Sequence, residues 1–147
     1  MALLARVTKR QSASTFLVAR RTFPHVRKVL ETRARPLGIE MREVDPATAD
    51  FGADVFGLYV QTPDARGQLH QLGDVIARAH AAGALVAVGT DLLSLAIIAP
   101  PGEAGADVVV GSAQRFGVPL GYGGPHAAFF ATREKFVGDW MLTGDQG

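Results

Sequence analysis

The amino-acid sequence predicts an α/β fold in which helices flank a mostly parallel sheet. Short apolar runs alternate with helix-like segments along the 147 residues, and strands connected through helices are typical of parallel sheets. The apolar runs lack a regular alternation with polar residues, which indicates strands that are buried on both faces. The length fits one domain or part of one.

Six strands are expected, at residues 15–19, 39–44, 54–61, 85–88, 106–110 and 127–131. A first helix begins after Thr22, a residue type that favours the N-cap, and ends at Pro36 and Gly38. A second helix covers residues 69–82, with Gly83 at its C-terminal end. We expect the last strand to be antiparallel, because the glycine-rich loop before it is too short for a helical crossover.

Composition and charge exclude several classes of function. The chain has no cysteine, which removes disulfides, thiolate metal sites and cysteine nucleophiles. Its net charge of +1 gives no case for nucleic-acid binding. The longest apolar run, residues 92–101, is too short and too interrupted to span a membrane. We therefore predict neither a nucleic-acid partner nor a membrane partner.

The first thirty residues carry seven basic and no acidic side chains. Such a segment is typical of a mitochondrial transit peptide, and equally of a solvated helix that leads into a strand. We prefer the second interpretation, because residues 16–19 already have the pattern of a core strand and leave no gap for processing.

The functional edge of such a sheet lies at the carboxyl ends of its strands, where ligands bind. This rule selects residues 61–64, 90–91 and 111–114. The first candidate there is Asp91, whose carboxylate could pair with a protonated ring nitrogen, a ribose hydroxyl or a metal ion. It could equally cap the turn that follows it.

The second candidate is the segment 111–126, which contains five glycines and two prolines and cannot be regular structure. Its glycines would allow backbone amides to approach a ligand or a neighbouring chain, or would serve a crowded crossover between strands. It matches neither the Walker spacing nor a dinucleotide-binding turn.

Among the histidines, His25 and His80 are expected on helices as surface or partly packed groups. Only His126 lies in this loop, and no pair has metal-ligand spacing, so we predict no metal site.

Residues 106–112, 114–119 and 121–132 (GYGGPHAAFFAT) closely resemble the amino-terminal half of glycine dehydrogenase (decarboxylating), the P protein of the glycine cleavage system. Residues 33–40, 79–88 and 100–107 add support, and the resemblance covers about residues 5–135. Residues 136–147 form a divergent tail. The resemblance implies the aspartate-aminotransferase-like fold, which is pyridoxal phosphate (PLP) fold type I. Residues 1–147 would then be a single incomplete domain, a part of its large domain.

The resemblance also implies a function in glycine catabolism. In this family of oxidoreductases, PLP acts as an electron sink while glycine loses carbon dioxide. The aminomethyl group then passes to the lipoyl group of the H protein. The implied partners are that protein and a lysine-bearing catalytic half of the same enzyme. The implied location is the cytoplasm of a bacterium, or the mitochondrion if the source is a eukaryote.

The position of the cofactor lysine decides the expected role. The catalytic half of the family carries a His-Lys-Thr segment, and counting back from Pro125 places its lysine at Gln114. Glutamine has no amine that could form a Schiff base. Asp91 matches the aspartate that pairs with the cofactor ring nitrogen. The chain therefore resembles the non-catalytic half, inactive alone and without a covalently bound cofactor.

In that interpretation one set of loop residues faces the catalytic half: Arg115, Tyr122, Gly123, Gly124 and His126. The alternative is a self-contained α/β domain that binds an anion or cofactor without catalysis, with the anion on the amides of the glycine-rich loop.

Overall fold

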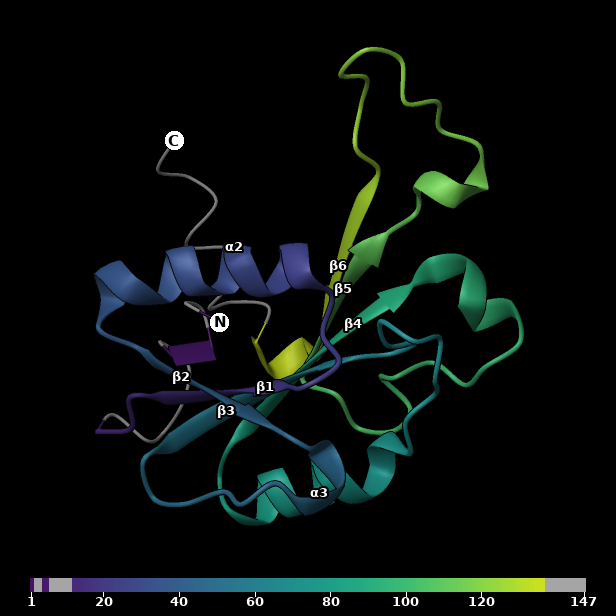
Figure 1. The fold of residues 1–147 in the computed structure, drawn as a ribbon. Helices are drawn as coiled ribbons and strands as arrows, with labels where there is room; N and C mark the ends of the chain where they lie inside the picture. Colours follow the sequence, from purple (N-terminus) through teal and green to yellow (C-terminus); the bar gives the residue numbers. More distant parts are fainter. Residues whose placement is uncertain (2–3, 6–11, 137–147) are drawn as a thin grey trace.

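The computed structural model describes residues 1, 4–5 and 12–136, which form a six-stranded sheet between two helical layers (Figure 1). The strand order is β2-β1-β3-β4-β5-β6. Helix α2 covers one face of the sheet and helix α3 covers the other. No helix in the described part of the chain is long and apolar enough to cross a membrane.

All six expected strands are present, with boundaries that differ from the expected ones by at most three residues. They are β1 (Thr15–Ala19), β2 (Glu40–Val44), β3 (Val55–Gln61), β4 (Leu85–Asp91), β5 (Val108–Ser112) and β6 (Ala128–Thr132). Strands β1 to β5 pair in parallel, and β6 pairs with β5 antiparallel, as expected. Strand β4 continues to Asp91, three residues beyond its predicted end, so this carboxylate lies on the last residue of the strand.

Helix α2 (Pro24–Ala34) begins one residue later than expected. Its N-cap is Phe23, so the prediction of Thr22 as the cap was wrong. The chain leaves β1 through a turn in which the Thr22 amide donates to Ala19 (3.0 Å), and this turn buries the threonine side chain. Helix α3 (Leu72–Ala81) is followed by Gly83 at a φ of 76°, the left-handed conformation expected after a helix end.

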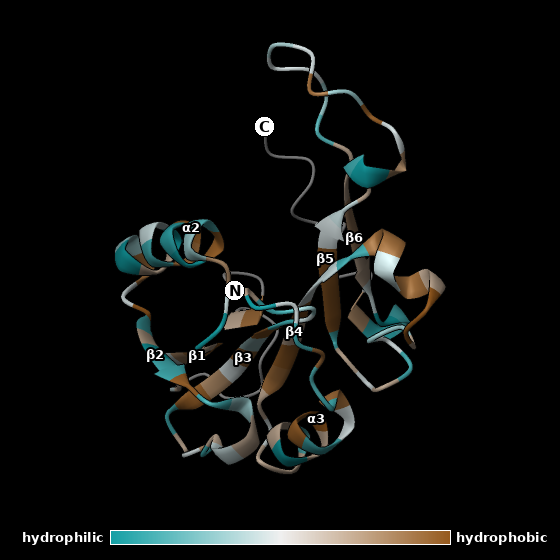
Figure 2. Ribbon diagram, turned by 45° about the vertical axis from the view of Figure 1, so that its right-hand side comes forward, coloured by the Kyte–Doolittle hydropathy of each residue, from teal (hydrophilic) through white to brown (hydrophobic). Residues whose placement is uncertain are grey.

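The core has two parts, one on each face of the sheet. On the α3 side, alternate strand residues such as Leu58 and Val88 pack against Ile76 of the helix. On the α2 side, Phe16 and Tyr59 belong to a second cluster. The central strands β1 and β3 are buried along their whole length, which is why their sequences show no polar alternation (Figure 2).

The glycine-rich segment 113–127, here called the arm, connects β5 to β6 and projects beyond the sheet (Figure 1). It contains one turn of 3-10 helix, η4 (Gln114–Phe116), and none of its residues is buried. Because it joins two neighbouring antiparallel strands, it is not the crowded crossover that the sequence left open.

Candidate functional site

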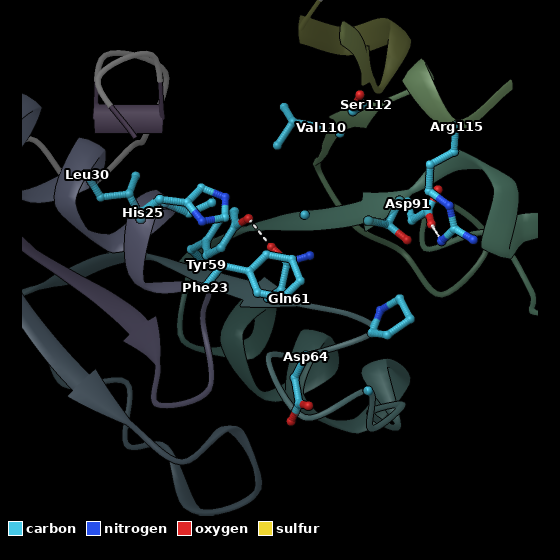
Figure 3. Close-up of a pocket in the computed structure, with 16 residues that line it drawn as sticks. Phe23, His25, Leu30, Tyr59, Gln61, Asp64, Asp91, Val110, Ser112 and Arg115 are labelled. Atoms are coloured by element: carbon cyan, nitrogen blue, oxygen red, sulfur yellow. Dashed lines mark hydrogen bonds and ion pairs between the residues drawn. The ribbon is translucent and has the colours of Figure 1, made fainter. Parts of the chain in front are cut away.

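A cleft of about 810 Å³ lies at the carboxyl ends of β3, β4 and β5, beside helix α2 (Figure 3). The expected functional edge contributes most of its polar lining, namely Gln61, Asp64, Thr90, Asp91 and Ser112, and Arg115 lies just beyond that edge. The strand-end rule therefore located the cleft from sequence alone. Its volume and its mixed apolar and polar lining are typical of a small-molecule site.

Sequence reasoning missed the wall of the cleft that α2 supplies. Phe23, His25, Val26 and Leu30 line it, and His25 had been expected only as a surface or partly packed helix residue. It is exposed, but it points toward the cleft (Figure 3). The missed signal was available, because Phe23 and His25 closely follow the carboxyl end of β1, where the same rule applies.

The floor of the cleft contains a buried polar pair. The hydroxyl of Tyr59 donates a hydrogen bond to Oε1 of Gln61 at 2.7 Å. Burial raises the pKa of Tyr59, so the phenol stays protonated and remains a donor. Gly89 lies directly beneath, where a β-carbon would collide with the phenol oxygen. The absence of a side chain at Gly89 thus lets Tyr59 lie across β4.

Asp64 organises the loop that follows β3. Its side chain is 1% exposed and accepts hydrogen bonds from the amides of Arg66 (2.8 Å) and Gln68 (3.0 Å). His70 Nε2 lies 3.1 Å from the second carboxylate oxygen. Burial alone would raise the pKa of Asp64, but these hydrogen bonds outweigh it and lower the pKa below its ordinary value.

The lowered pKa of Asp64 gives a pH prediction. Its hydrogen bonds stabilise the fold fully above the ordinary aspartate pKa of about 3.9, and this contribution is lost as the pH falls through the lower, folded-state value. Urea unfolding measures how much Asp64→Asn lowers the free energy of unfolding. This loss should therefore be constant above about pH 5 and become smaller below it. Exposed Asp50→Asn is the control for loss of a carboxylate. A cost of Asp64→Asn that stays unchanged down to about pH 3 would contradict the prediction.

Asp91 and Arg115 form an ion pair at the rim of the cleft (Figure 3). Oδ2 of the carboxylate contacts the Arg115 guanidinium, and Oδ1 accepts the amide of Leu93 at 3.0 Å. The second contact caps the 3-10 helix η3 (Leu92–Ala96). Asp91 therefore makes the capping contact that the sequence offered as one of two roles.

The other candidate residues are not in the cleft. Gln114 lies in η4 at the base of the arm and is not among the lining residues. Tyr122, Gly123 and His126 are exposed on the arm itself. Tyr122 has a φ of 48°, a left-handed conformation that is costly for a residue with a side chain. The predicted site thus divides into a cleft group and an arm group.

The described residues do not fit covalently held PLP. No lysine lines the cleft, so no amine is available there for a Schiff base. Each oxygen of Asp91 already has one partner within the chain, the Leu93 amide for Oδ1 and the Arg115 guanidinium for Oδ2. Among the described residues, no group of three or more potential metal ligands occurs either.

The fold is part of the large domain of PLP fold type I enzymes. A crystal structure of glycine decarboxylase (P-protein) of the glycine cleavage system, in inhibitor-bound form, matches 92% of this chain and 31% of its own, with a TM-score of 0.80 and 35% identity. Cystathionine gamma synthase from Xanthomonas oryzae matches 76% of this chain and 30% of its own, with a TM-score of 0.62 and 23% identity. The second likeness shows the fold alone.

The chain belongs to the glycine cleavage system P-protein family, whose model matches residues 1–141. Glycine dehydrogenase (decarboxylating) of Parasynechococcus marenigrum is 53% identical over 92% of this chain and 14% of its own length. The mitochondrial enzyme of Dictyostelium discoideum is 46% identical over 93% of this chain and 14% of its own length. The resemblance seen in the sequence is confirmed, and the chain spans about one seventh of these relatives.

Proposed function

We propose that this chain is a segment of the non-catalytic half of a glycine decarboxylating P protein. The intact enzyme would use PLP to release carbon dioxide from glycine and pass the aminomethyl group to the lipoyl group of an H protein. In it, this segment would form one incomplete domain that supports an active site built mainly by a lysine-bearing half. Its location would be the cytoplasm of a bacterium, or the mitochondrion of a eukaryote.

One observation carries this proposal: among the described residues, no lysine lines the cleft of a PLP-type fold. The chain has lysines only at positions 9, 28 and 135. Counting back from Pro125, the position of the family's cofactor lysine falls on Gln114. A PLP enzyme needs an amine at this point to hold its cofactor. The family membership and the missing amine together favour a supporting role over a catalytic one.

The arm supplies the proposed contact with the lysine-bearing half. Its apolar side chains Phe116, Leu120 and Tyr122 are all more than half exposed, at 62%, 78% and 112%. Exposed aromatic groups with a polar tip are frequent anchors at interfaces. The alternative of a self-contained anion-binding domain explains neither these exposed side chains nor an arm without burial against its own sheet.

Covalent labelling tests the proposal directly. Incubation with PLP followed by borohydride reduction should give at most partial labelling of surface lysines, and none within residues 86–132. The lysine-bearing half of a relative, treated in parallel, should be labelled stoichiometrically at one residue. This chain alone should release no carbon dioxide from glycine. Stoichiometric labelling within residues 86–132, or decarboxylation by the chain alone, would contradict the proposal.

A further inference from the structure

Three aspartates stand at the carboxyl end of the sheet and make the same local contact. Asp45 follows β2 and accepts the amide of Ala47 at 3.0 Å. Asp64 follows β3 and accepts a hydrogen bond from the Arg66 amide at 2.8 Å. Asp91 accepts a hydrogen bond from the Leu93 amide, two residues further along the chain, at 3.0 Å. Each carboxylate thus closes the turn by which the chain leaves a strand. The cap on Asp91 is therefore a general feature of this edge.

The second oxygen of Asp91 pairs with Arg115 across 24 residues of sequence, and the second oxygen of Asp64 likewise faces Arg21, at 3.6 Å. Arg115 lies in η4, where the arm leaves β5. At its base the arm also has backbone hydrogen bonds, such as that from the Ala113 amide to the Ala127 carbonyl at 2.6 Å. The amides of Phe116 and Val118 bond only to nearby carbonyls, those of Ala113 and Gln114. In η4, it is the side chain of Arg115 that ties the arm to β4 and η3, through its ion pair with Asp91.

We propose that Asp91 is a positioning residue that braces the arm, and that it does not serve as a ligand for a cofactor ring. One carboxylate fixes η3 through Oδ1 and holds the base of the arm through Oδ2. The Arg115 guanidinium is the cation that Oδ2 contacts. The brace is a property of this chain alone. Its consequence, that the braced arm is presented to a lysine-bearing half, rests on the proposed function.

Amide hydrogen exchange on the full chain tests the brace without any partner. Arg115→Gln removes the ion pair, and should speed exchange of the Phe116 and Val118 amides about two- to fivefold, the range for an exposed pair. Asp91→Asn should do the same, because asparagine keeps the cap and loses the charge. The double variant should exchange no faster than either single one, since all three lack the same contact.

The cap is separated from the brace by a second substitution. Asp91→Ala should additionally speed exchange of the Ile97 and Ile98 amides, which bond to Ser94 in η3. Asp45→Asn is the matched control, because Asp45 makes the same cap without an ion pair to an arginine among the described residues. It should leave the arm unchanged.

Two results would overturn the brace. One is an unchanged exchange rate at Phe116 and Val118 in both Arg115→Gln and Asp91→Asn. The other result uses pyridoxine 5′-phosphate, which has no aldehyde. This compound would slow amide exchange at the cleft residues of the unchanged chain, but not at those of Asp91→Asn. That second result would make Asp91 a ring ligand. The brace and the proposed function fail separately, because exchange in the free chain reports the first, and association with a lysine-bearing half reports the second.

Discussion

Replacing Asp107 with asparagine is expected to lower the free energy of unfolding by about 3 kcal/mol. The Asp107 side chain is fully buried, at 0% exposure. One oxygen accepts the Val86 amide at 2.9 Å and contacts His80 Nε2 at 2.7 Å, and the other faces Arg133 Nε at 3.7 Å. The backbone carbonyl of Asp107 also accepts the hydroxyl of Thr132.

This expected cost follows from where the partners of Asp107 lie. Val86 begins the buried part of β4, His80 lies in the last turn of α3, and Arg133 follows β6. Asparagine keeps one oxygen as an acceptor but loses the charge, and its NH2 group would face either the Val86 and His80 donors or the Arg133 guanidinium. The value is at the lower end of the range for a broken buried charge pair, because His80 and Arg133 stay about one third exposed. For a domain of ordinary stability, this is a large fraction of the total.

Equilibrium unfolding in urea measures the effect. The matched control is Asp74→Asn on α3, where the carboxylate is exposed and pairs with Arg78 one helical turn away. That change should cost less than about 0.5 kcal/mol. If Asp107→Asn costs no more than Asp74→Asn, the buried carboxylate does not hold β4, α3 and β6 together as described.

The sheet could be predicted from sequence because its signals are local. Continuous apolar runs such as residues 55–60 indicate strands buried on both faces, and the short glycine-rich loop before β6 indicated its antiparallel direction. The strand-end rule then located the cleft, because parallel strands bring their carboxyl ends to one edge. Helix boundaries were less secure, as Thr22 shows, since its side chain is taken into the core instead of capping α2.

Contacts between distant segments could not be predicted in the same way. The sequence placed Arg115 among the loop residues that face a catalytic half, yet the fold brings Asp91 to it from 24 residues away. Similarly, Asp107 gains His80 and Arg133 only when β4, β5 and β6 pair. Such pairs depend on strand register and helix placement, which local patterns do not encode. The wall that α2 adds to the cleft is a different case, because Phe23 and His25 follow the carboxyl end of β1, where the strand-end rule applies.

The arm gives the second large expected effect. Gly123→Val should weaken association of this half with a lysine-bearing half about tenfold or more, and should lower glycine decarboxylation by the assembled enzyme. Gly123 has a φ of 87°, and valine in that left-handed region costs about 1–2 kcal/mol. Because nothing lies within 4 Å of its missing β-carbon, the strain should reshape the arm and leave the sheet intact.

Gly38→Val is the matched control, since Gly38 also has a positive φ, of 64°, and no neighbour within 4 Å of its missing β-carbon, but follows the 3-10 turn after α2, outside the arm. It should carry similar strain with no loss of association. Arg115→Ala should weaken association more mildly, because its ion pair with Asp91 is largely exposed. Association and activity can be followed by titrating one half with the other. Normal assembly and normal decarboxylation by both Gly123→Val and Arg115→Ala would show that the arm is only a connection between β5 and β6.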